Sequence, residues 1–224
     1  MATLAVLGIF SFAASGISAQ DAQNDGPDPA LRDYLSANGL LNRGLYELAT
    51  AEYRKFLSEH EDHEKAPVAR YGLGVSLFRM GKFEAAVTEL TPLQESSHFE
   101  FAAETGTILG QCHLARQQYP EAAEAFQWVV RKHGGHDLAD EAAAGQVEAL
   151  YFDGRYDDAI DECQKFVTRW SDNPLRERIE FFGAFAAMAR HDDAKAADRF
   201  AALLERYPNG PFAEQASLLL AQCY

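Results

Sequence analysis

Two short segments of the chain place pairs of imidazoles close together. His60 and His63 flank two acids, and His133 and His136 flank two glycines. Imidazole nitrogens and carboxylate oxygens are ligands that Zn²⁺ accepts, but a metal site also needs further ligands held in a fixed geometry. Both segments fall in the expected connections between helices, where polar side chains are commonly solvated. We therefore expect no metal site and no cofactor.

Other residues capable of chemistry lack the context that catalysis requires. The sequence contains no Gly-x-Ser-x-Gly motif and no glycine-rich phosphate loop. Cys112, Cys163 and Cys223 are an odd number of thiols at wide spacing. That spacing fits neither a disulfide framework nor a zinc pair, and it is typical of small buried side chains. We expect a protein that is not an enzyme.

The helices that carry these residues are expected to repeat along the chain. An alanine recurs at intervals of 36 or 37 residues, and a period of this size predicts a solenoid of stacked helical units. The recurrent alanines are Ala49, Ala86, Ala122, Ala159 and Ala196. With this alanine at position 20, units start near residues 30, 67, 103, 140 and 177, and a sixth opens near 214. Position 8 is then small in all units but one and faces a mostly larger side chain at position 24, which lets paired helices approach closely.

This pattern resembles the tetratricopeptide repeat, whose signature has a small residue at position 8, alanine at 20 and an aromatic residue at 24. The resemblance covers about residues 30–224. It implies an all-α fold, a right-handed superhelix of helix-turn-helix pairs with five complete repeats and a partial sixth. The unit is two or three residues longer than the usual 34. Only Pro208 occupies position 32, where the family carries proline.

The N-terminal segment has the composition of a secretory leader. An apolar run over residues 4–14 is followed by small residues and an abrupt polar start at Gln20. This order predicts a signal peptide over residues 1–19, although no Lys or Arg precedes the apolar run. Residues 20–29 are expected to form a disordered linker before the solenoid of residues 30–224. The chain stops at position 11 of the sixth unit, so we expect the parent protein to continue.

The leader, the long unit and residues 206–214 resemble the exported bacterial branch of the family. That branch includes envelope proteins of outer-membrane assembly and of the Tol-Pal system. The resemblance implies a protein exported to the periplasm or cell envelope. Because the apolar run is too short to span a bilayer, we expect no integral membrane protein after the signal is cleaved.

The charge of the chain narrows the class of partner. A net charge of −14 and a pI near 4.9 argue against nucleic acid, since phosphate binding needs clustered Lys and Arg. Almost all of the excess acid lies before Gln164. A basic partner would therefore dock against the first four units.

In the resembled family, the first helix of each unit lines a concave groove through positions 2, 5, 9, 12 and 13. Carried over to this chain, these positions give an apolar strip, which is typical of an interaction site. The candidate groove residues are Tyr34, Tyr71, Val75, Phe78, Arg79, Gln111, Glu148, Tyr151, Phe152, Phe181, Phe185 and Met188. An alternative stays open, in which the rings at positions 5 and 12 pack between neighbouring units and never meet water.

These observations together favour a non-catalytic protein–protein interaction scaffold. We expect its groove to hold a peptide or a helix of another protein, with aliphatic anchors and basic charges on the partner. The alternative is a structural spacer or a self-assembling repeat array whose groove holds no ligand.

Overall fold

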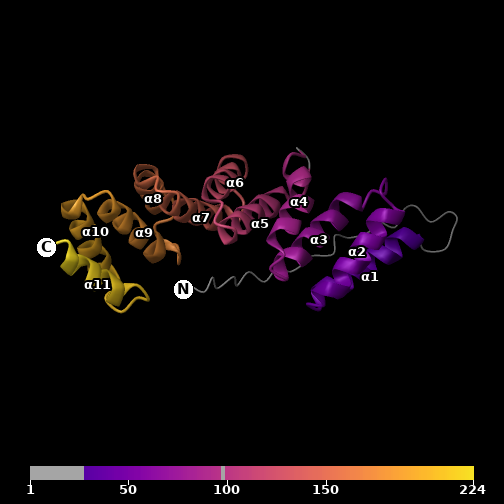
Figure 1. The fold of residues 1–224 in the computed structure, drawn as a ribbon, viewed down its shortest axis with the longest axis horizontal. Helices are drawn as coiled ribbons and strands as arrows, with labels where there is room; N and C mark the ends of the chain where they lie inside the picture. Colours follow the sequence, from indigo (N-terminus) through magenta and orange to yellow (C-terminus); the bar gives the residue numbers. More distant parts are fainter. Residues whose placement is uncertain (1–27, 97–98) are drawn as a thin grey trace.

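The computed structural model describes residues 28–96 and 99–224. Within these ranges the chain forms helices joined by short turns and connections, and no strand. The helices are α1 (Pro29–Asn42), α2 (Tyr46–Glu59), α3 (Ala66–Arg79), α4 (Phe83–Gln94), α5 (Ala102–Ala115), α6 (Tyr119–Lys132), α7 (Ala139–Phe152), α8 (Tyr156–Arg169), α9 (Arg176–Ala189), α10 (Asp193–Arg206) and α11 (Ala213–Gln222). Figure 1 shows them as one elongated row that runs from α1 to α11.

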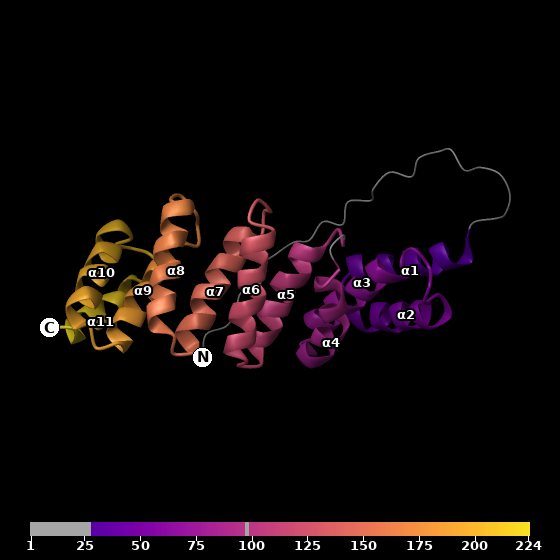
Figure 2. The same ribbon diagram turned by 90° about the horizontal axis from the view of Figure 1, so that it is seen from above.

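Each repeat is a pair of helices that pack side by side, as the view in Figure 2 shows. The first helices of the units are α1, α3, α5, α7, α9 and α11, and each begins one residue before the start predicted from the alanine period. The expected all-α solenoid of five helix pairs and a partial sixth is confirmed. The periodic packing of small against large side chains is therefore sufficient to place every unit.

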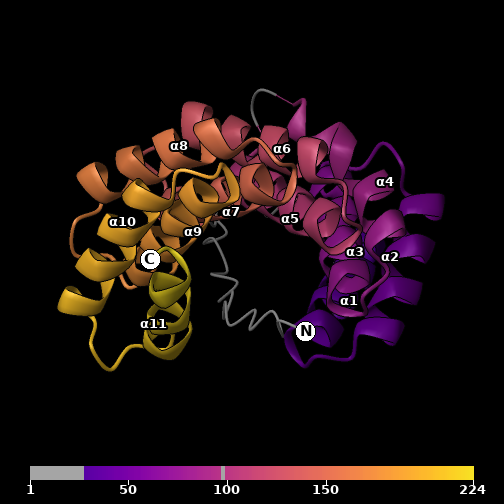
Figure 3. The same ribbon diagram turned by 60° about the vertical axis from the view of Figure 1, so that its left-hand side comes forward.

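The row of helix pairs is curved. Figure 3 shows the first helices along the inside of the curve and the second helices, from α2 to α10, along the outside. Each first helix also contacts the first helix of the next unit, from α1 and α3 through to α7 and α9. The concave face is therefore built from consecutive first helices, whose side chains can converge on one cleft.

The turn inside each repeat uses a left-handed residue to end the first helix. Gly44, Gly81 and Gly154 adopt φ of 71°, 71° and 77°. In the third and fifth units the same place is taken by Gln117, with φ of 59°, and by His191, with φ of 61°. Residues with a side chain are strained in this region. The turns that lack glycine in the sequence therefore keep the geometry of the others.

The interior follows the repeat. All five recurrent alanines have no exposed surface, because they lie where paired helices meet. The buried side chains form four clusters: a large one that spans α1 to α6, one around Phe126 and Ala159, one around Phe166 and Ile179, and one around Phe200 and Leu219. The N-terminal units thus share one core, whereas the C-terminal half divides into smaller ones.

The start of the described chain overlaps the end of the predicted linker. Asp28 caps α1, since its Oδ1 accepts a hydrogen bond of 2.9 Å from the backbone N–H of Ala30. Pro29 opens that helix. The predicted signal peptide and residues 20–27 of the predicted linker lie outside the described residues. Among the helices of the described ranges, none is both long and apolar enough to cross a bilayer.

Candidate functional site

The concave face carries a cleft of about 530 Å³ near the middle of the row. Four consecutive first helices supply most of its lining, which combines apolar and charged side chains. The lining residues are Phe78, Arg79, Gly81, Phe83, Gln111, Leu114, Ala115, Phe126, Asp140, Glu141, Gly145, Glu148, Leu175 and Arg178. We call this set the central cleft. It is lined by the C-terminal ends of α3 and α5, much of α7 and the start of α9.

One wall of the central cleft holds a carboxylate and a guanidinium in contact. Glu148 on α7 is 9% exposed, and its Oε1 lies 3.0 Å from Nε of Arg178 on α9. Burial raises the pKa of the Glu148 carboxyl, and the positive charge of Arg178 opposes that rise. The Arg178 Nε makes no aligned hydrogen bond, so the contact is an ion pair without hydrogen-bond geometry. Removing either partner of such a buried pair is costly, because the other charge is then left uncompensated.

A second carboxylate faces the same space. Oε1 of Glu141 accepts a hydrogen bond of 2.8 Å from Nε2 of Gln111, which links α7 to α5. Burial raises the pKa of the Glu141 carboxyl, the adjacent Asp140 raises it further, and Arg178 and Gln111 lower it. The cleft thus concentrates acid on α7, with Arg178 beside it on α9.

Four of the predicted groove residues line the central cleft. Phe78, Arg79, Gln111 and Glu148 come from positions 12, 13, 9 and 9 of their units. Phe78 supplies an apolar surface at the end of α3, next to Phe83 at a ring separation of 6.0 Å. The structure brings these four side chains together from three helices.

Four other predicted residues are buried in the helix packing and offer no groove surface. They are Tyr34, Tyr71, Val75 and Phe181, with exposed fractions of 6%, 2%, 8% and 4%. Tyr71 stacks on Phe101 at 5.0 Å, and Phe181 stacks on Phe212 at 4.9 Å. The rings at position 5 therefore pack between helices and are not exposed in the groove, which is the alternative that the sequence left open.

Three more predicted residues form an aromatic cluster at the end of α7. Tyr151 stacks on Phe185 of α9 at 5.1 Å, and Phe152 stacks on Tyr119 of α6 at 5.4 Å. Phe182 contacts both Tyr151 and Phe152. Phe152 is half exposed. This cluster is separate from the residues that line the central cleft.

The last predicted groove residue belongs to the C-terminal core. Met188 is partly buried and packs against the cluster that contains Phe181 and Phe200. The twelve candidates therefore do not form one strip. They divide between the central cleft, the aromatic cluster and the interior.

The paired imidazoles of the sequence also have other partners: the His60 and His63 rings lie edge to face at 6.5 Å, and each of the other rings has contacts of its own. Nε2 of His63 lies 3.0 Å from Oδ2 of Asp28, and its Nδ1 accepts the backbone N–H of Lys65. His133 packs on Trp128 at 4.9 Å, whereas Nε2 of His136 lies 3.5 Å from Oε1 of Glu104. Neither pair points both rings at one place.

Two of the three cysteines, Cys112 and Cys163, are buried in environments that suppress their reactivity. Burial raises the pKa of the Cys112 thiol to about 12 and that of the Cys163 thiol to about 11. Sγ of Cys163 also lies 3.3 Å from the carbonyl oxygen of Ile179, to which it donates. A thiol that stays protonated is a poor nucleophile.

Several lining residues of the central cleft were not among the twelve candidates. Leu114, Glu141 and Arg178 occupy groove positions 12, 2 and 2, so the carried-over pattern contains them. Asp140 and Gly145 occupy positions 1 and 6, which that pattern omits. A glycine inside a helix does not by itself predict a close approach, because a Cβ at Gly145 would meet the Phe126 ring whereas one at Gly39 would meet nothing within 4 Å.

The paired helices and their concave cleft define an α-solenoid of helix-turn-helix repeats. A family model for the tetratricopeptide repeat matches residues 34–91 and 109–174, together more than half of the chain. The chain belongs to the tetratricopeptide repeat family.

Solved structures with this fold cover most of the chain. YrrB, described as "a TPR protein with an unusual peptide-binding site", is 18% identical with a TM-score of 0.69, over 84% of this chain and 91% of that one. MamA from Desulfovibrio magneticus RS-1 is 22% identical with a TM-score of 0.65, over 82% and 99%. A tetratricopeptide repeat protein from Parabacteroides merdae is 13% identical with a TM-score of 0.70, over 87% and 72%. No curated protein matches the sequence. At these identities the likeness is one of fold.

Proposed function

We propose that this chain is a non-catalytic scaffold that binds an extended or helical segment of another protein in the central cleft. The observation that carries the proposal is the cleft itself, because four consecutive first helices converge on about 530 Å³ of space. Concave sites of this size with an apolar lining and a few placed polar groups are where proteins bind ligands. The peptide-binding site named for YrrB, which has the same fold, supports this use of the fold.

The lining of the cleft selects the chemistry of the bound segment. Phe78 and Leu114 offer an apolar surface for an aliphatic anchor. Asp140 and Glu141 place acid at the start of α7, which favours Lys or Arg a few residues from the anchor. The anchor supplies most of the affinity, and the charges supply selectivity and association rate.

The test begins by selecting peptides from a displayed random library against the wild-type chain. We expect the selected peptides to share an aliphatic residue and nearby Lys or Arg. Phe78→Ala should weaken their binding by about 2–4 kcal/mol, as expected of an anchor contact at the centre of an interface. Isothermal titration of one synthetic peptide against each variant provides the measurement.

Two control variants separate the cleft from the rest of the surface. Leu48 on α2 is 55% exposed and is not among the residues that line the cleft, so Leu48→Ala removes an exposed apolar side chain without touching the cleft. It should leave affinity unchanged. Tyr151→Ala alters the aromatic cluster instead and should have a smaller effect than Phe78→Ala. Equal peptide affinity for wild type and Phe78→Ala, with both chains folded by circular dichroism, would favour the spacer and refute the proposal.

We further propose that the protein works in the periplasm or cell envelope of a bacterium. The support is the order of apolar run, small residues and polar start in residues 1–20, which resembles an export signal. Cell fractionation of a C-terminally tagged chain, followed by N-terminal sequencing, tests this. We expect a mature chain that starts at Gln20; an uncleaved chain in the cytoplasm would contradict it.

A further inference from the structure

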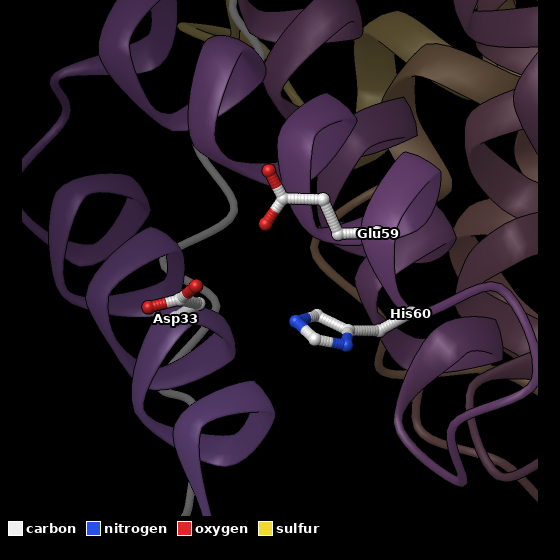
Figure 4. Close-up of side chains that lie close together, drawn as sticks. All are labelled: Asp33, Glu59 and His60. Atoms are coloured by element: carbon white, nitrogen blue, oxygen red, sulfur yellow. The ribbon is translucent and has the colours of Figure 1, made fainter.

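The first repeat brings together three potential metal ligands from two helices. Asp33 lies on α1, Glu59 is the last residue of α2, and His60 caps that helix. One ligand atom from each lies within 4.8 Å of the other two. Figure 4 shows the Asp33 carboxylate and the His60 ring facing each other across the gap between the helices, with the Glu59 carboxylate beside them.

The cluster has an excess of negative charge, which favours a bound cation. A carboxylate oxygen of Asp33 and one of Glu59 lie within 4.8 Å of each other, and the described residues give the Glu59 carboxylate neither an ion pair nor a hydrogen bond. Asp33 has only long contacts, 3.9 Å to Nζ of Lys55 and 3.7 Å to Nε of Arg32. Two like charges at such short range repel each other unless a positive group lies between them.

The fifth repeat shows how the fold closes the same place with opposite charges. Positions 4 and 30 of that unit are Glu180 and Arg206, and Oε1 of the first lies 2.6 Å from Nη1 of the second. In the first unit the same positions hold Asp33 and Glu59. The cation that joins the two helices in the fifth unit is thus replaced by a second carboxylate in the first.

Position 31 adds the third ligand without disturbing the packing. His60 packs on Phe56 at a ring separation of 5.4 Å, as Trp170 at the same position of the fourth unit packs on Phe166 at 5.1 Å. An aromatic ring at this position is therefore a feature of the repeat. Among the residues that fill it, a histidine ring also offers a nitrogen ligand.

We propose that Asp33, Glu59 and His60 bind a zinc ion that joins α1 to the end of α2. Imidazole and carboxylate are both zinc ligands, and a site with three protein ligands keeps a fourth position for water. The centre of a triangle with sides of 4.8 Å lies about 2.8 Å from each corner, so an approach of about 0.7 Å per ligand reaches the usual zinc distance of about 2.1 Å. Side-chain rotation supplies that movement, because Glu59 is exposed and the other two are partly exposed.

The test is titration of the full chain, freed of metal by chelation, with zinc chloride alone. We expect one zinc ion per chain with its heat signal abolished in His60→Phe, which keeps the ring on Phe56 and removes the ligand nitrogen. Asp33→Asn and Glu59→Gln should each weaken binding by at least about tenfold, since even outer-shell partners change metal affinity by about 10–100-fold. Lys55→Gln should strengthen it, because that ammonium competes for Asp33.

A matched control makes the same change at the same position of another unit. His133 occupies position 31 of the third unit, where the cluster of acids is lacking, so His133→Phe should bind zinc as the wild type does. Added zinc should also raise the melting temperature of the wild type and of His133→Phe, and not that of His60→Phe. Zinc binding of equal strength in wild type and His60→Phe, or none in the wild type, would overturn the proposal.

Discussion

The ring of Phe126 makes the third and fourth repeats sensitive to a single methyl group. Its tip enters the space between α5 and α7, where Gly110 and Gly145 face it, and Phe126 is 1% exposed. A Cβ added at Gly145 would lie 2.6 Å from Cζ of the ring, and one at Gly110 would lie 2.6 Å from Cε1. Carbon atoms in contact are about 3.5–4.0 Å apart, so the ring must move by roughly 1 Å towards its own helix.

Gly145→Ala should therefore destabilise the chain in spite of its higher helix propensity. Overpacking of a buried site costs about 1–3 kcal/mol, against a gain of about 1 kcal/mol from replacing glycine in a helix. Gly39 on α1 provides the control, because a Cβ there meets nothing within 4 Å. Since both changes carry the same propensity gain, the stability of Gly39→Ala minus that of Gly145→Ala isolates the steric cost, about 1–3 kcal/mol.

Urea unfolding followed by circular dichroism measures both variants. The slope of the transition must be compared as well, because repeat arrays can unfold in parts. Phe126→Leu in the Gly145→Ala background should recover part of the loss, since the shorter side chain gives up the overlapping atoms. Gly145→Ala at or above the stability of Gly39→Ala would refute the close approach between the ring and α7.

Three further predictions concern the recurrent alanines at position 20, the turns and the cleft. Ala122→Leu and Ala159→Leu, at sites with no exposed surface, should each destabilise the array by about 1–3 kcal/mol, measured by thermal melting; unchanged melting would contradict the helix pairing. Gln117→Gly should stabilise it by up to about 1 kcal/mol, because Gln117 has a φ of 59°, and an unchanged urea midpoint would mean that the turn is unstrained. Burial raises the pKa of Glu148 in the folded chain above its ordinary value of 4.5. Protonation of Glu148 therefore stabilises the folded chain, and this stabilisation is complete below pH 4.5. It is lost as the pH rises through the higher pKa of the folded state. As the pH increases from 4.5, the unfolding free energy of the wild type should therefore fall relative to that of Glu148→Gln. If the two unfolding free energies change in parallel with pH, the raised pKa of Glu148 is contradicted.

The repeat architecture was predictable from the sequence because it depends on volume at few positions. The alanine at position 20 recurs where paired helices meet, and all five copies have no exposed surface, so a small side chain is what the close contact requires. Once that position is known, the helix starts follow within one residue. The left-handed turn at Gln117 was not predictable in the same way, since its conformation is imposed by the helices on either side of it.

The groove was harder to predict because exposure depends on the neighbouring unit. Tyr71 and Phe181 are covered by Phe101 and Phe212, and both of these lie two residues before the start of the next unit. An aromatic residue at that place in the sequence is the signal that a ring at position 5 is buried. Phe78 stays accessible, because its position 12 lies at the far end of the helix, beside the turn.

The division of the interior into four clusters affects how the chain responds to force. A pull on its two ends loads the clusters in series, because each repeat contacts only its neighbours. We expect the smaller C-terminal clusters to yield before the large one that spans α1 to α6, so that the molecule lengthens in steps. A segment held in the central cleft contacts both the large cluster and its neighbour, so its binding would resist separation of these two clusters.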